Sequence, residues 1–106
     1  MMDIQFNTDN QIHGGADVSE AIEARLRERL ARFSSRLTRI EVHGRDVDGT
    51  TNGESGVELT LEARPAGQQP LSVTGNGPEL EAALNSALPK LVSRLDSVFG
   101  RLDRVR

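Results

Sequence analysis

Basic side chains recur in the first half of the sequence at a spacing suited to binding phosphate. The arginines are separated by alternating steps of four and three residues, which return to the same side of an α-helix. Arginine binds phosphate through two parallel N–H groups. The chain as a whole has a formal net charge of −3, so this positive charge is local. The spacing predicts one line of phosphate-binding side chains on one helix: Arg25, Arg29, Arg32, Arg36 and Arg39.

A second basic set follows near the C-terminus, at spacings of four and seven residues: Lys90, Arg94 and Arg101. It flanks the apolar stripe of a second predicted helix, on the same rotational side as the first set. With the two helices side by side and running in a similar direction, one basic line edges the groove between them. The other line lies on an outer flank. Together they predict an RNA-facing surface.

Arginines beside an apolar stripe also have a purely structural use. Their stems cover the edge of a core while their charged ends pair with acids such as Glu28. The sequence leaves this alternative open.

Composition limits the other possibilities. A chain of 106 residues with 36% hydrophobic residues is predicted to form one domain, residues 1–106. Aromatic residues are 3%, so RNA binding is expected to depend on phosphate charge and not on an aromatic platform. There is no cysteine. Neither a signal peptide nor a long apolar run is recognisable, which predicts a cytoplasmic protein without a membrane partner.

Catalytic and metal chemistry find little support. His13 and His43 are the only histidines, and the acidic residues 46, 48 and 54 do not match a calcium loop. The GNG at 75–77 lacks the lysine of a phosphate loop and is better explained as a turn before a helix. No nucleophile with a neighbouring base is recognisable. We therefore expect no enzyme activity, no cofactor, no metal and no small-molecule substrate.

The basic residues must be positioned by regular elements, and the first half predicts two strands around a helix. Residues 3–8 alternate as a strand. Asp17 and Glu20 have the spacing of a capping box at a helix start. The buried stripe of that helix is Ile22, Leu26, Leu30, Phe33 and Leu37. Residues 39–48 then alternate again, with Gly44 at an inward position that indicates a bulge or a close backbone approach.

The second half predicts a hairpin and a long helix. A turn-rich loop at 49–56 separates the second strand from a third at 56–64, and a fourth strand follows at 70–75. The helix runs from Pro78, at its first position, towards Leu102, and Pro89 inside it predicts a kink. The resulting order is β-α-β-β-β-α. We predict an α+β fold of two layers, a four-stranded sheet with both helices on one face.

The chain resembles the family of hibernation-promoting factor and ribosome-associated inhibitor A. The similarity lies in MDIQFNT (2–8), the helix at 17–33, RIEVHGRDVD (39–48), VELTLEA (57–63) and the segment 71–95. Each motif alone is common, and their order and spacing carry the resemblance. Because no further domain follows, the chain resembles the short form of the family.

This resemblance implies a bacterial stress-response protein that binds the small ribosomal subunit and silences idle ribosomes. Its members lie in the channel for mRNA and tRNA and contact ribosomal RNA through basic residues of the two helices. Carried over, this role falls on Arg25, Arg29, Arg32, Arg36, Arg39, Lys90, Arg94 and Arg101. The chain departs from the family pattern where Ser93 and residues 96–99 replace basic residues.

Two functions therefore remain open from the sequence. One is a ribosome-associated translation inhibitor. The other is a protein-interaction module of the same fold without RNA affinity, which would pair through the outer face of the sheet or an exposed strand edge. Its partner is left open, and a second copy of the chain, giving a homodimer, is one alternative. Double-stranded RNA binding is disfavoured because the chain lacks a lysine-rich helix start.

Overall fold

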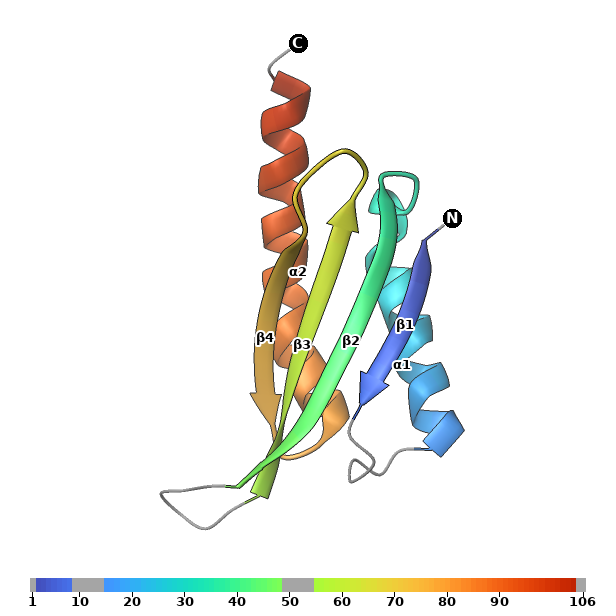
Figure 1. The fold of residues 1–106 in the computed structure, drawn as a ribbon, viewed down its shortest axis with the longest axis vertical. Coiled ribbons are helices and arrows are strands. Elements are labelled where there is room, and N and C mark those ends of the chain that lie inside the picture. The colour runs from blue at the N-terminus through green and yellow to red at the C-terminus, as the bar shows by residue number, and fades with distance from the viewer. Residues whose placement is uncertain (1, 9–14, 49–54, 105–106) are drawn as a thin grey trace.

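A computed structural model describes residues 2–8, 15–48 and 55–104. Its elements, in chain order, are β1 (Asp3–Thr8), α1 (Gly15–Arg29), the 3-10 helix η1 (Ala31–Phe33), β2 (Leu37–Asp48), β3 (Ser55–Pro65), β4 (Leu71–Gly77) and α2 (Leu80–Arg104). The strands form one sheet in the order β1-β2-β3-β4, with β1 parallel to β2 and the other pairs antiparallel. Both helices cover the same face of this sheet and run in a similar direction (Figure 1). The predicted α+β fold is confirmed.

The core lies between the sheet and the two helices. Alternate residues of β3 point into it, and α2 contributes a continuous apolar stripe that includes Leu84, Leu88, Leu91 and Leu95, all buried. From α1, the predicted Ile22 and Leu26 are buried, as is Leu30 directly after the helix. No polar side chain is buried within the described ranges. The opposite face of the sheet therefore carries the polar residues.

The first helix is shorter than the arginine spacing predicts. It ends at Arg29, η1 follows, and β2 already begins at Leu37. Backbone hydrogen bonds between residues three apart stabilise the turn between η1 and β2: Ser34 N donates to Ala31 O at 3.1 Å, and Arg36 N donates to Phe33 O at 2.9 Å. Two serines disfavour further helix here, while β-branched residues in β2 favour pairing with β1 and β3. Leu37 is buried, but as a strand residue.

The start of α1 and the irregularity of β2 also differ from prediction. Because α1 begins at Gly15, Asp17 lies within its first turn and not at a capping position, so the predicted capping box is wrong. Of the two alternatives predicted at Gly44, the bulge is wrong, since Gly44 pairs regularly with Leu59 and the register shifts between Leu37 and Arg39 instead. The close backbone approach stays a prediction. Most of the predicted loop at 49–56 lies outside the described residues.

The predicted turn at 75–77 is part of β4. Gly75 and Gly77 pair with Leu59 and Val57 of β3. A Cβ atom added at Gly75 would lie 2.5 Å from Ala83 O and from Ala87 N of α2, which leaves no room for it. These glycines therefore let the backbones of β4 and α2 approach each other.

The long helix begins later than predicted and is not interrupted. It starts at Leu80, so Pro78 precedes it, and Glu79 O accepts the first helical bond, from Ala83 N at 3.0 Å. The helix is assigned without a break through Pro89, whose side chain is exposed. The predicted kink at Pro89 stays a prediction.

The glycine contact predicts opposite effects for two Gly→Ala variants. Gly75→Ala should lower the free energy of unfolding by about 3 kcal/mol, because its methyl group meets immobile backbone atoms. Gly100→Ala, in α2, should raise it by about 0.5–1 kcal/mol, because its Cβ meets no atom within 4 Å and alanine favours helix. Urea denaturation measures both. A Gly75→Ala protein as stable as the parent would contradict the close packing of β4 against α2.

Candidate nucleic-acid interface

The five arginines predicted to form one line are divided among three places. Arg25 and Arg29 lie on α1, and Arg32 and Arg36 lie on η1 and the turn that follows it. Arg39 lies on β2. Because α1 ends at Arg29, the prediction of one continuous helical line is wrong.

Arg25 and Arg29 are exposed on α1. Arg25 lines a groove between the two helices, together with Ile22 and Glu28 of α1 and Glu81 and Leu84 of α2. Neither arginine forms an ion pair with any residue in the described part of the chain. Their guanidinium groups are therefore available to an anion, although the groove also contains carboxylates.

Arg32 is held on two sides, by Asp96 of α2 and by Phe33 of η1. Its Nη1 lies 2.7 Å from Asp96 Oδ1, and its Nη2 donates to Asp96 Oδ2 at 2.9 Å. Its Cζ lies 4.4 Å from the centroid of the Phe33 ring. The Arg32 side chain thus forms a bidentate ion pair and a cation–π contact at the same time.

Arg36 repeats this arrangement two turns further along α2. Its Nη2 and Nη1 donate to Asp103 at 3.2 and 3.3 Å, and its Cζ lies 4.1 Å from the centroid of the Phe99 ring. The rings of Phe33 and Phe99 are themselves 5.7 Å apart. For Arg32 and Arg36, the structure therefore shows the pairing with acids that the sequence left open, with aspartates of α2 in place of Glu28.

The sequence contained a signal for these partners. Asp96 and Asp103 are seven residues apart, which places both on the same side of α2. Asp96 lies in the stretch where the family pattern has basic residues, and sequence reasoning counted it only as a departure from that pattern; it did not consider Asp103. The role of both aspartates as partners of Arg32 and Arg36 requires knowing how the helices pack.

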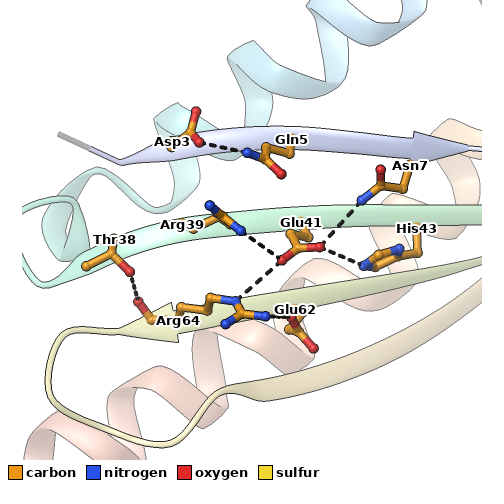
Figure 2. Close-up of polar contacts among 9 residues, drawn as sticks. All are labelled: Asp3, Gln5, Asn7, Thr38, Arg39, Glu41, His43, Glu62 and Arg64. Atoms are coloured by element: carbon orange, nitrogen blue, oxygen red, sulfur yellow. Dashed lines mark hydrogen bonds and ion pairs between the residues drawn. The ribbon is translucent and has the colours of Figure 1, made fainter.

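Arg39 lies on the open face of the sheet, away from the helices (Figure 2). Its Nη1 is 3.5 Å from Glu41 Oε2, and Nε of Arg64, which pairs opposite Arg39 on β3, is 3.4 Å from the same oxygen. His43 Nε2 and Asn7 Nδ2 lie 3.4 Å from Glu41 Oε1. Glu41 is thus the centre of a polar cluster, and Arg39 does not share a surface with the arginines of α1.

Among the basic residues of α2, Lys90 lies beside β4. Lys90 Nζ donates to Thr74 O of β4 at 2.8 Å. Arg94 and Arg101 are exposed, and neither has an ion-pair partner among the residues described. Arg25 therefore edges the groove between the helices, and Lys90 lies beside β4. A shared RNA-facing surface of the two helices stays a prediction.

Other chemistry is not assembled in the described ranges. They contain no cluster of three metal-ligating side chains. His43 belongs to the Glu41 cluster, and His13 lies outside the described residues, as do the side chains of Asp48 and Glu54. No helix within them is long and apolar enough to cross a membrane.

The family described as "Sigma 54 modulation protein / S30EA ribosomal protein" matches residues 11–103. The chain belongs to this family. No individual curated protein matches it. Membership in the S30EA family confirms the resemblance seen in the sequence and makes this a ribosome-associated protein; the family is not known for enzymes.

The Glu41 cluster predicts a measurable loss of stability for Glu41→Gln. This change removes the negative charge between Arg39 and Arg64, and we expect the free energy of unfolding to fall by about 1 kcal/mol at low salt. The loss should shrink at high salt because the two guanidinium groups are then screened. Glu58→Gln is the matched control, since it removes only the Arg45–Glu58 pair at 2.8 Å. Equal losses in the two variants would contradict a special role for Glu41.

Proposed function

We propose that this protein binds the small ribosomal subunit through ribosomal RNA and inhibits translation by idle ribosomes. Membership in the S30EA family supports ribosome association. The observation that carries the finer step is a set of exposed arginines on the two helices that form neither an ion pair nor a side-chain hydrogen bond with the described residues: Arg25, Arg29, Arg94 and Arg101. Residues 1–106 are proposed to act as one domain.

The two helices contribute to this interface in different ways. Arg25 and Arg29 are one turn apart, about 6 Å along α1, and follow its exposed side. Lys90, Arg94 and Arg101 follow the outer flank of α2. Glu28 and Glu81 share the groove with Arg25, so phosphates are expected at its rim and not at its floor. Removing an exposed arginine from this set should weaken RNA binding chiefly through counterion release.

A second candidate is a protein-interaction module without RNA affinity. It is favoured by the ion pairs of Arg32 and Arg36 with Asp96 and Asp103, which occupy two of the predicted RNA-binding residues. The sheet also ends at β1, whose outer edge is a template for strand addition by a partner or a second copy. Such pairing depends little on salt, whereas phosphate binding depends on it steeply.

The first experiment is co-sedimentation with purified small ribosomal subunits over a range of salt concentrations. Arg25→Gln/Arg29→Gln should lower the slope of log affinity against log salt by about 1.5, because about 0.7–0.9 belongs to each phosphate contact. At low salt the affinity should fall by roughly tenfold for each arginine removed.

Arg27→Gln/Arg45→Gln is the matched control. It removes the same charge from exposed arginines that pair with Glu23 and Glu58. We expect its affinity and salt slope to stay close to those of the parent. A phosphate interface at Arg25 and Arg29 would be excluded if the affinity for the subunit did not change with salt concentration. It would also be excluded if both double variants lowered the affinity equally.

A further inference from the structure

Arg32, on η1, and Arg36, in the turn that follows, each contact both an aspartate and an aromatic ring. Each guanidinium group has a carboxylate at its edge, from Asp96 or Asp103, and a phenyl ring beneath it, from Phe33 or Phe99. Both rings are buried, at 5% exposure. The rings therefore cannot stack on a ligand themselves, but they support two arginines that can.

The outer sides of the two arginines remain open. The side chain of Arg32 is 59% exposed and that of Arg36 is 38% exposed. They border a hollow of about 280 Å³, lined by Arg32, Phe33, Arg36, Asp96, Phe99, Gly100 and Asp103. A Cβ added at Gly100 would meet no atom within 4 Å, so the hollow is open on this side.

This geometry suits a flat ligand better than a phosphate. The carboxylates already accept N–H groups in the guanidinium plane, which leaves fewer donors for phosphate oxygens. The open face of an arginine plane is a surface on which RNA bases stack. A base that stacks there keeps both ion pairs and both cation–π contacts intact.

We propose that Arg32 and Arg36 are two stacking platforms for unpaired bases of single-stranded RNA. This inference rests on the proposed function and adds base contacts to the phosphate contacts of Arg25 and Arg29. It identifies the ligand as an unpaired strand, because bases within a duplex are stacked on their neighbours. It also removes the need for exposed aromatic residues, which the chain lacks.

The test compares two labelled oligoribonucleotides of about twelve nucleotides, a length that a single small domain covers. One carries all its bases, and the other has abasic positions along an unchanged phosphate backbone. Fluorescence anisotropy at low salt should show at least about tenfold tighter binding of the base-bearing strand. In Arg32→Lys/Arg36→Lys, which keeps the charge and loses the plane, this preference should fall to near one.

Two further variants separate stacking from phosphate binding. Arg25→Gln/Arg29→Gln should weaken binding of both strands by the same factor and keep the base preference. Gly100→Leu should lower the preference by filling the hollow, with the helix stabilised by the loss of glycine. Circular dichroism checks that each variant is folded.

The outcomes distinguish this inference from the proposed function. Equal binding of the two strands by the parent protein, binding of neither strand, or a base preference that survives in Arg32→Lys/Arg36→Lys overturns the platforms. The proposed function stands in each case if subunit binding still depends on salt and on Arg25 and Arg29. If the protein sediments with small subunits at no salt concentration, both proposals fall.

Discussion

The close contact between β4 and α2 sets the arrangement of the charged residues. With glycine at positions 75 and 77, the backbone of β4 lies directly against Ala83 and Ala87. This contact fixes the rotation of α2 about its own axis. Lys90, about one turn beyond Ala87, then reaches Thr74 O at the edge of the sheet. The opposite flank of α2 turns its aspartates towards η1. Two small residues in a strand thus decide which charges of α2 meet arginines and which meet solvent.

The fold was accessible from sequence because its elements each have one apolar face. Alternation identified the strands, and the stripe of α2 identified the long helix, so the two-layer arrangement followed. The sequence predictions failed where the same residues are compatible with two local structures. The GNG at 75–77 has the composition of a turn, but its glycines serve a backbone contact between elements that are assembled only in the fold. A sequence pattern cannot show a contact of this kind.

The candidate site was less predictable than the fold. Steps of four and three residues placed Arg32, Arg36 and Arg39 on a helix that ends before them. The same spacing of arginines continues by coincidence through the 3-10 helix η1 and into β2. The alternation of residues in β2, which begins at Leu37, favours a strand over further helix. Sequence reasoning correctly singled out Arg25 and Arg29 as residues of the first helix. It could not pair Arg32 with Asp96, because that pair joins residues far apart in the chain and depends on the rotation of α2.

An acidic chain can use its arginines for RNA in two ways, and they differ in energetic cost. If a phosphate displaced Asp103 from Arg36, one exposed ion pair worth at most about 1 kcal/mol would be lost. The freed carboxylate would then lie beside the incoming phosphate, and the two negative charges would repel each other. A stacking base avoids both costs, because the aspartate stays in the guanidinium plane and the ring of Phe99 stays beneath it. In the proposed RNA interface, the aspartates that would weaken phosphate binding at Arg32 and Arg36 are therefore the groups that would hold these planes ready for a base.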